Sequence, residues 1–583
     1  MSENILTAII PDAKPRNGLA GLAYWRHDLV AGLMVSLTSL PLSLGIAVAS
    51  GAPPIAGLMS AIIAGLLFPF LGGAYVTISG PAAGLAPALL AAMIALGHGH
   101  LETGYPRLLA VICMVGAIQI VLSWLGAAKL SAAFPVSVVE GMLASIGLLI
   151  VTKELPHFIG HDFKSHAFFG ILQEVPEEIR LLDPKSFGVG IVCLILLFVL
   201  SMKKIQQRLA VPPPLVVVGV GMILGGALGV DAHHLIKIPD DILTHGIVLP
   251  DFRSLFSDRS IAWAIVTGVV TLVLIDGVES LATIKAIDKI DPFKRKSSPG
   301  RTLMAMGVSN ICSSVAGGLT IIPGGVKSKL CIVSGGRTLW ANFYNALFLV
   351  AYLFAGKGLI NLIPYSALAA ILIYTGYKMF EPKIWLHVLH IGPEQFFVFS
   401  VTVATTLATD LLIGIFTGMV VELLLSMALT SHHVRTPLDR PMTFREVFPY
   451  ALAHLSQFLR NPVMRREQRA DGYHVYLDRP LVCFNSLHLD RELSSIPDDA
   501  ANVYLHIGSH VMIIDHTSCD SLMQFAEEYE SSRRGRVELV GMDRLVGWSH
   551  SNNGARLAPV SANGHAQPVA IPEDSLADVR AVD

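Results

Sequence analysis

Long apolar runs separated by short polar stretches fill roughly the first 430 residues of the chain. A run of about 20 apolar residues matches the thickness of a bilayer's hydrocarbon core, so these runs predict membrane-spanning helices. We expect seven runs before a polar gap and seven after it. They lie at residues 29–49, 54–71, 76–96, 107–125, 134–151, 187–200 and 211–230, and then at 261–283, 302–319, 326–334, 340–355, 359–379, 396–408 and 411–429.

Glycine and proline interrupt two of these runs at matching places in the two halves. The first break reads TISGPAAG at residues 77–84, and the second reads IIPGGVKS at residues 321–328. A broken helix in the bilayer frees backbone groups that have no water to bond, so it persists only inside the protein or along a polar cavity. Paired breaks of this kind indicate a binding site near the membrane midplane.

The second break leads directly into Lys327. A half-helix that begins there would direct free N–H groups and the positive end of its dipole into the cavity. The first break would supply a second helix start, with Pro81 in the first turn, where its missing N–H is harmless. We therefore predict an anion site formed by Ser79, Gly80, Pro81 and Ala82 together with Gly324, Gly325, Val326 and Lys327. In the alternative interpretation these residues only allow close helix packing, and Lys327 belongs to a cytoplasmic turn.

Carboxylates enter the membrane in the run at 261–283. Helical spacing places Asp276, Glu279 and Thr283 on one face. Carboxylates at membrane depth are costly and usually handle ions or protons, so these residues are predicted to couple a cation. The alternative is that Asp276 and Glu279 lie hydrated near the cytoplasmic mouth. Glu140 and Glu422 are interpreted as acids of a first helical turn or of the membrane surface.

Composition excludes several classes of protein. Hydrophobic residues make up 53% of the 583 residues and charged residues 15%, which is too apolar for a soluble enzyme. Neither a catalytic nucleophile motif nor a zinc-ligand spacing occurs, so no enzyme activity is expected. The net charge of -2 argues against a nucleic-acid partner, because phosphate binding needs a concentrated basic face. The six cysteines stand singly and are interpreted as small buried residues.

Lysine and arginine concentrate after the sixth, eighth and twelfth runs. Positively charged short loops stay cytoplasmic, so both termini are predicted to be cytoplasmic in a multi-pass protein of the inner or plasma membrane. No removable signal peptide is expected at the N-terminus. Histidines of the predicted external connections, His157, His161, His166, His233, His234 and His245, are expected to be solvated, with metal binding or pH sensing as the alternative.

The composition changes after residue 430. Residues 431–470 are predicted to be a polar linker, residues 471–548 a small α/β domain, and residues 549–583 a disordered tail. Strands are expected at 473–477, 481–484, 502–507 and 537–540, with a helix from Asp515 to about residue 533. Asp515 is predicted to cap that helix.

Several motifs follow one another along the chain. They are Asp28 to Leu33 leading to Pro41, Ser79-Gly80-Pro81, Glu279 to Thr283, Asn310 with Gly317-Gly318, and Gly335-Gly336-Arg337-Thr338. In this order and spacing they resemble the sulfate permease (SulP) family of anion transporters over nearly the whole chain. The segment from Val511 to Ser518 resembles the STAS domain that family members carry after the membrane part.

The resemblance implies an all-α membrane domain of about fourteen segments at 28–430. It would consist of two inverted seven-segment repeats, about 28–230 and 260–430, arranged as a core and a gate domain. A cytosolic N-terminus would occupy 1–27, and a cytosolic α/β STAS-like domain 471–548. Segments three and ten would be half-helices, and the protein would be a homodimer with a possible cytosolic partner at the STAS-like domain.

The resemblance also implies function. Family members move bicarbonate, sulfate or other small inorganic anions, by alternating access, with sodium or protons or by exchange. Glu279 and Thr283 match the residues that hold Na⁺ in sodium-coupled members, and no other cofactor is expected. Lys327 stands where many members have arginine, and Leu42 follows Pro41 where members have a polar residue, so Ser43 is the nearest substitute.

Three alternatives remain open at this point. They are an uncoupled chloride or anion exchanger or channel, a nucleobase:cation symporter of the related fold, and a membrane sensor without transport. Bicarbonate and sulfate are not distinguished by the sequence, and neither are Na⁺ and H⁺.

Overall fold

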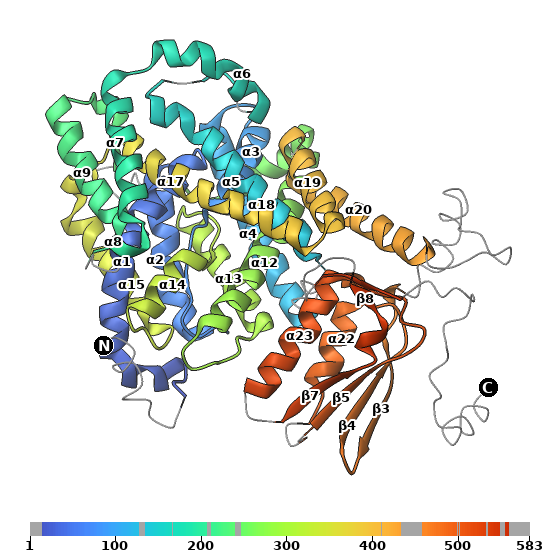
Figure 1. Cartoon of the computed structure of the whole chain (residues 1–583). Helices are drawn as coiled ribbons and strands as arrows, with labels where there is room; N and C mark the ends of the chain where they lie inside the picture. Colours follow the sequence, from blue (N-terminus) through green and yellow to red (C-terminus); the bar gives the residue numbers. More distant parts are fainter. Residues whose placement is uncertain are drawn as a thin grey trace. The chain divides into compact units, whose positions relative to one another are not determined.

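The computed structural model of the protein (Figure 1) describes residues 14–558 apart from 127–133, 162, 166, 207–210, 239–246, 410, 433–457, 498–499, 501, 532–534 and 548–553. The chain divides into two compact units. One consists of Met1–Ser131 and Leu143–Phe380, and the other of Ala132–Met142 and Glu381–Asp583. Each unit has its own buried apolar core.

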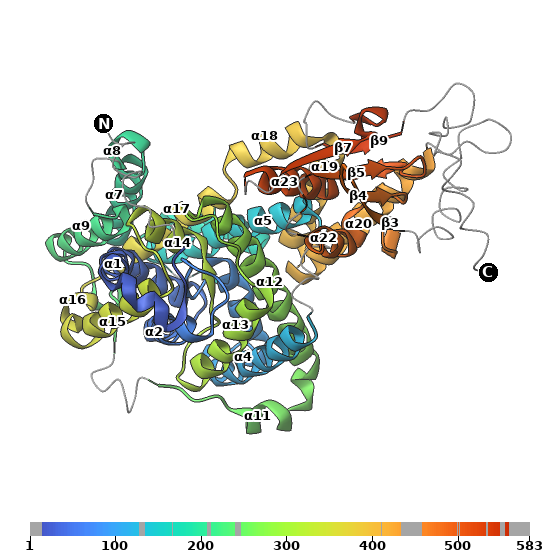
Figure 2. The ribbon, with the colours of Figure 1, turned by 90° about the horizontal axis from the view of Figure 1, so that it is seen from below.

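Each of the fourteen predicted runs overlaps a helix, although in the run at 76–96 the helix begins only at residue 86. In the first unit they are α1 (Trp25–Ala49), α2 (Pro54–Leu71), α3 (Ala86–Leu96), α4 (Leu101–Trp124), α7 (Pro184–Leu200), α9 (Pro213–Leu228), α12 (Ala262–Ile290), α13 (Pro299–Val315), α14 (Gly325–Val333), α15 (Trp340–Ala355) and α17 (Tyr365–Met379). Helix α5 (Val136–Ile159) begins in the second unit and continues in the first, and α19 (Pro393–Ala408) and α20 (Leu411–His432) belong to the second. Helices α1, α2 and α15 pack side by side (Figure 1 and Figure 2).

Several further helices were not predicted. Among them are α6 (Phe168–Glu178) and α18 (Pro382–Ile391). Both are amphipathic, so their apolar residues form a stripe rather than a continuous run, and a search for continuous runs does not find them.

Six helices of the described chain are long and apolar enough to cross a membrane, and a seventh span results if α6 and α7, bent by 116°, count as one. Helices α3 and α14 are much shorter, with 11 and 9 residues. At 1.5 Å per residue they span roughly half of a 30 Å hydrocarbon core. Their length therefore agrees with the expected half-helices in segments three and ten.

The two Gly/Pro breaks pair with each other. Strand β1 (Ile78–Gly80) and strand β2 (Ile322–Gly324) form an antiparallel two-stranded sheet in which Ser79 lies opposite Pro323. This pairing satisfies backbone groups that the interrupted helices leave free. The breaks lie inside the helical unit, because Ile78 and Ile322 are both almost completely buried.

A buried acid connects α1 to the segment before α15. The Asp28 carboxylate accepts hydrogen bonds from the backbone N–H groups of Arg337 and Thr338, at 2.7 and 3.1 Å, and from the Thr338 hydroxyl at 2.5 Å. Asp28 is 0% exposed. Two motifs that lie about 310 residues apart in the sequence are thus parts of one contact.

The C-terminal part of the second unit is an α/β region. Its main sheet has the order β3 (Val463–Arg469), β4 (Gly472–Leu477), β5 (Asn502–Ile507) and β7 (Arg536–Val540). The first pair is antiparallel and the other two pairs are parallel. Alternate residues of β4 and β5, such as Val475 and Leu505, pack into a core with α22 (Ser486–Ser494) and α23 (His516–Ser531). The predicted cap is confirmed, because Asp515 Oδ1 accepts the Ser518 N–H at 2.7 Å.

Parts of the C-terminal prediction are wrong. Residues 481–484 do not form a strand, because Cys483–Asn485 is a 3-10 turn that leads into α22. Strand β3 lies within the predicted linker 431–470, and β9 (Arg556–Leu557) lies within the predicted tail 549–583 and pairs with β6 (Ile513–Ile514) and β8 (Val546–Gly547). Strand β3 is an almost wholly polar edge strand, which the apolar pattern does not reveal. Residues 433–457 of the predicted linker, 549–553 and 559–583 of the predicted tail, and 1–13 of the predicted N-terminus lie outside the described residues.

Candidate anion-binding site

The ammonium group of Lys327 lies against the backbone of the opposite break. Lys327 is only 4% exposed, and its Nζ has no hydrogen-bond partner among the described residues. A Cβ atom placed on Gly80 would lie 2.7 Å from this Nζ. Gly80 therefore leaves the space that the ammonium group occupies. The residue pair brings a positive charge from the second break to the first.

Uncapped helix starts surround this charge. Gly324 precedes α14 in an extended conformation, and no side chain caps the helix. Ala82 is likewise extended before the 3-10 turn Ala83–Leu85 that leads into α3, and it also lacks a side-chain cap. Free N–H groups at both helix starts favour negative charge. Ser328 holds the two breaks together, because its Oγ accepts the Ile78 N–H at 2.9 Å and donates to the Gly324 carbonyl at 2.6 Å.

Two details of the predicted anion site differ in the structure. Pro81 precedes the extended Ala82 and is not in a helical turn, whereas Pro87 occupies the first turn of α3. The Val326 side chain is 62% exposed, so only its backbone is left to face an anion. Ser43 is fully buried in α1, and its backbone carbonyl lies against Gly57 of α2. Ser43 and Ser79 of β1 each have a buried Oγ without a hydrogen-bond partner among the described residues.

Helix α12 carries the predicted cation-coupling residues to both helix starts. A Cβ atom placed on Gly84, in the turn before α3, would lie 2.5 Å from Glu279 Oε2 and 2.8 Å from Oε1. A Cβ atom on Gly325, the first residue of α14, would lie 3.9 Å from the Thr283 methyl group. Glu279 Oε2 is buried and has no hydrogen-bond partner in the described part of the chain. One carboxylate and one threonine thus lie beside the two half-helices.

Asp276 takes a different position from Glu279. Its carboxylate is 0% exposed, so the interpretation of a hydrated acid at the cytoplasmic mouth is wrong. Asp276 Oδ2 accepts hydrogen bonds from Gln119 at 3.0 Å and from Asn310 at 3.3 Å. Asn310 also donates to Gln119 Oε1 at 2.8 Å and accepts the Ile321 N–H at 2.6 Å. The network connects α12, α4 and α13 to the backbone just before β2.

Sequence reasoning did not identify Gln119. The sequence does show an amide side chain in the middle of the apolar run at 107–125. A buried amide in a membrane helix needs hydrogen-bond partners, so this residue could have been singled out. The run shows neither that the amide faces Asp276 nor that it lies beside Asn310.

The prediction for Glu422 is wrong. Glu422 is only 3% exposed and lies near the middle of α20, not in a first turn or at a surface. Glu140 lies in the second turn of α5, and its Oε2 is buried with no hydrogen-bond partner among the described residues. Glu422 therefore contacts protein rather than water, whereas Glu140 is half-buried.

Two histidines of the predicted external connections lie close to carboxylates. His157 lies within α5, 3.5 Å from Glu154, and His161 Nδ1 lies 2.6 Å from Glu178. Their side chains remain 34% and 40% exposed, so both histidines are solvated in part and also lie close to an acid. His166 and His245 lie outside the described residues.

Comparisons with known proteins agree with this architecture. The bicarbonate transporter BicA of Picosynechococcus sp. is 25% identical over 427 residues, which cover 71% of this chain and 73% of that protein. The solved transmembrane domain of a cyanobacterial bicarbonate transporter BicA has a TM-score of 0.59 at 22% identity, and the match covers 67% of this chain and 97% of that one. The murine Solute Carrier 26 anion transporter Slc26a9, solved in the inward-facing state, has a TM-score of 0.61 at 15% identity, with 92% of this chain and 90% of that one covered.

These two structures establish the fold of the chain. The BicA match covers the polytopic membrane part, and the Slc26a9 match extends over the C-terminal α/β region as well. The family assignment comes from the sequence itself. The model of the Sulfate permease family matches residues 25–402, which include both breaks, the acids of α12 and the contact of Asp28 with Arg337 and Thr338. The chain therefore belongs to the Sulfate permease family.

Proposed function

We propose that this protein is a secondary active transporter of a small inorganic anion, bicarbonate or sulfate. The observation that carries the proposal is the buried Lys327 ammonium group, which lies against Gly80 and has no hydrogen-bond partner among the described residues. A buried charge without a partner is unfavourable, so a site of this kind is best explained by an anion that completes it. The family and the transport of bicarbonate by the relative BicA support the substrate class.

The proposed anion site consists of the Lys327 ammonium group and the backbone around the two helix starts, at Ser79–Ala82 and Gly324–Val326. A lysine is a compact point charge, whereas arginine presents a planar fork suited to oxyanions. Lysine therefore imposes little geometric selection between planar bicarbonate and tetrahedral sulfate. We infer that the size of the cavity and the backbone N–H groups select the anion.

We propose that Glu279 and Thr283 couple a cation, sodium or proton, to the anion. The Glu279 carboxylate lies against Gly84, directly before the half-helix α3, and its negative charge opposes an anion at the same site. A bound Na⁺ or a proton removes that repulsion, so the two ligands bind more favourably together than separately. Asp276 is assigned a positioning role through Gln119 and Asn310, not contact with the cation.

The remaining assignments are proposals about the whole protein. Alternating access would move a core domain with both half-helices against a gate domain, as the family resemblance implies. We propose a transport domain at 28–430 and a cytosolic STAS-like domain that extends from β3 to β9. The lysine and arginine distribution supports cytoplasmic termini in an inner or plasma membrane. Homodimer formation and a cytosolic partner rest on the family resemblance alone.

The decisive experiment is uptake of labelled sulfate and bicarbonate into proteoliposomes, with and without a sodium or pH gradient. Lys327→Gln is expected to weaken apparent anion affinity about tenfold to a hundredfold, because a charged hydrogen bond contributes about 1.5–3 kcal/mol. Lys329→Gln is the matched control, since Lys329 lies on the same helix but is exposed. Equal affinities in the two variants would refute the charge contact.

The same vesicles test the coupling. Glu279→Gln should leave anion binding intact while uptake no longer responds to the cation gradient. If uptake in this variant still follows the gradient, Glu279 is not the coupling residue.

A further inference from the structure

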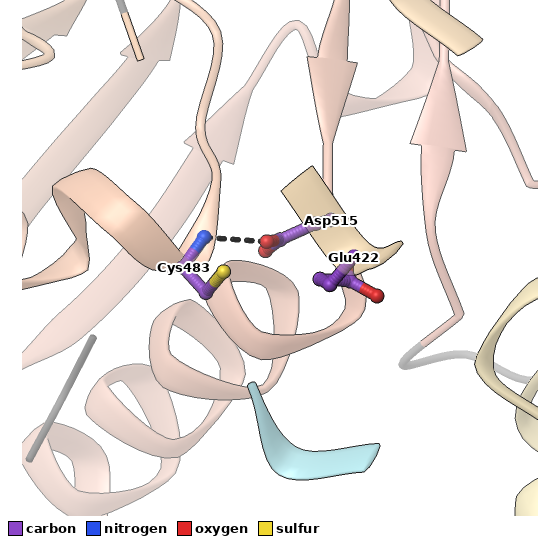
Figure 3. A group of neighbouring side chains, drawn as sticks. All are labelled: Glu422, Cys483 and Asp515. Atoms are coloured by element: carbon purple, nitrogen blue, oxygen red, sulfur yellow. Dashed lines mark hydrogen bonds between the residues drawn. The ribbon is translucent and has the colours of Figure 1, made fainter. Parts of the chain in front are cut away.

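A second buried polar cluster lies in the second unit, and the proposed transport site does not use it. Its members are Glu422 from α20, Cys483 from the turn before α22, and Asp515 at the start of α23 (Figure 3). One ligand atom from each side chain lies within 4.8 Å of the other two. The three residues are 3%, 0% and 2% exposed, so water does not solvate them.

The hydrogen bonds of the cluster leave acceptor capacity toward its centre. Asp515 Oδ1 accepts the Ser518 N–H at 2.7 Å. Asp515 Oδ2 accepts the Cys483 N–H at 2.5 Å, the bond drawn in Figure 3. The Cys483 thiol also hydrogen-bonds to the Asp515 carboxylate, and a metal ion bound by both groups would replace that contact. The Gln395 side chain hydrogen-bonds to the Glu422 carboxylate. Glu422 Oε2 is buried and has no hydrogen-bond partner in the described part of the chain.

We propose that Glu422, Cys483 and Asp515 bind a divalent metal ion of the Zn²⁺ class. A thiolate with two carboxylates is a ligand set that zinc accepts, and the thiolate disfavours Mg²⁺ and Ca²⁺, which require oxygen ligands. In a tetrahedral zinc site the ligand atoms lie roughly 3.4–3.6 Å apart, given the usual Zn–S and Zn–O distances. The present separations need to shorten by little more than 1 Å, which side-chain rotation supplies. Three protein ligands leave the fourth position for water or for one further side chain.

The electrostatics of the cluster favour a cation. Burial, followed by the neighbouring Asp515 and Glu422 carboxylates, raises the pKa of the Cys483 thiol well above its ordinary value. Burial also raises the pKa of Asp515. Metal binding by the thiol would release its proton. A bound ion would connect α20 to two separate segments of the C-terminal region.

The test uses the full-length protein in detergent, with Zn²⁺ as the titrant and the metal content measured after dialysis. Wild-type protein should retain a Zn²⁺ ion that Cys483→Ser and Glu422→Gln lose, with affinity weaker by more than about tenfold. Cys519→Ser is the matched control, because Cys519 is another buried cysteine of the same region that is not part of the cluster. Its affinity should equal that of the wild type.

Cobalt substitution gives an independent measurement that needs no variant. Co²⁺ bound at this site should produce cobalt–thiolate charge-transfer absorption in the wild type and in Cys519→Ser. If the wild type lacks this absorption, or if Zn²⁺ binds wild type and Cys483→Ser equally, the proposal is refuted and the cluster is a proton-sharing contact. Should Cys483→Ser fail to fold, the wild-type cobalt spectrum still decides.

Discussion

At the scale of single residues, the transport proposal depends on the two glycines that let charged groups approach the backbone. Gly80 accommodates the Lys327 ammonium group and Gly84 accommodates the Glu279 carboxylate. Neither position has a positive φ, so the requirement is space rather than backbone conformation. A methyl group would occupy the volume in which the charged atoms lie.

Gly84→Ala should therefore weaken cation-dependent uptake about tenfold. Its Cβ would lie 2.5 Å from Glu279 Oε2, and overpacking of this kind costs about 1–3 kcal/mol. The sodium or proton dependence of uptake in proteoliposomes measures the effect. Gly277→Ala on α12 is the control, because a Cβ there meets no atom within 4 Å. Unchanged cation dependence in Gly84→Ala would show that the carboxylate moves away freely.

At the scale of elements, the backbone before β2 is held by side chains of three helices. Asn310 is the central residue of this network, since its amide contacts Gln119, Asp276 and the Ile321 N–H. A buried amide that loses its partner costs about 1–3 kcal/mol. The position of the second break therefore depends on α4, α12 and α13 together.

Asn310→Ala should lower the stability of the protein by about 2–4 kcal/mol, because it leaves the Ile321 N–H and Gln119 Oε1 unpaired. Thermal unfolding in detergent provides the measurement. The adjacent Ser309→Ala should change stability by less than about 1 kcal/mol, since Ser309 Oγ is buried without a hydrogen-bond partner among the described residues. A comparable loss in both variants would contradict the assigned role of the network.

Two histidines on neighbouring strands of the C-terminal sheet contact each other. His474 on β4 and His506 on β5 share a hydrogen bond of 2.8 Å, and the Tyr476 ring stacks on His506 at 4.5 Å. Burial, and then the neighbouring His474 and Arg469, lower the pKa of His506 below 6.5. The folded state therefore binds fewer protons than the unfolded state in the range between the two pKa values.

The stability of this sheet should consequently rise with pH from the lowered pKa up to about 6.5 and fall on acidification through the same range. Hydrogen exchange of β4 and β5 in the full-length protein, corrected for the intrinsic pH dependence, reports it. His506→Gln should flatten the dependence, whereas Tyr476→Phe, which keeps the stacked ring, should retain it. An identical dependence in wild type and His506→Gln would exclude this histidine as the cause.

At the scale of the whole molecule, α20 and the C-terminal region share an apolar cluster within the second unit. Met427 of α20 packs with Phe458, Val482, Ile513 and Leu557, all of them buried. Fully burying a side chain of this size contributes about 1.5–3 kcal/mol. These contacts are additional to the peptide chain of residues 433–457, which joins α20 to the C-terminal region.

A protease site inserted within residues 433–457 tests whether this cluster holds the two parts together. After cleavage, both fragments should co-purify. Met427→Asp should separate them, because an unpaired buried charge costs about 3–5 kcal/mol. Exposed Met464→Asp on β3 serves as the control and should leave the fragments associated. Separation of the cleaved wild type would refute the prediction.

Much of the fold was predictable because the length and continuity of an apolar run can be read directly from neighbouring residues of the sequence. The runs at 54–71 and 340–355 coincide with α2 and α15 to the residue, and 502–507 coincides with β5. Predictions failed where the signal was not continuous apolarity, as in the amphipathic α6 and α18, the polar edge strand β3 and the turn at Cys483–Asn485. In these segments partners from elsewhere in the chain decide the conformation.

The sequence by itself determined that the chain enters the membrane, that two Gly/Pro breaks interrupt it, that Lys327 lies in the second break, and that Glu279 and Thr283 share one face of a membrane helix. Only the tertiary structure decided which groups meet: Lys327 with Gly80, Glu279 with Gly84, Asp276 with Gln119 and Asn310, and Glu422 with Cys483 and Asp515. The physical reason is that hydropathy and backbone propensity act within a few residues, whereas these contacts join positions between about 30 and about 250 residues apart. Helix packing sets their approach.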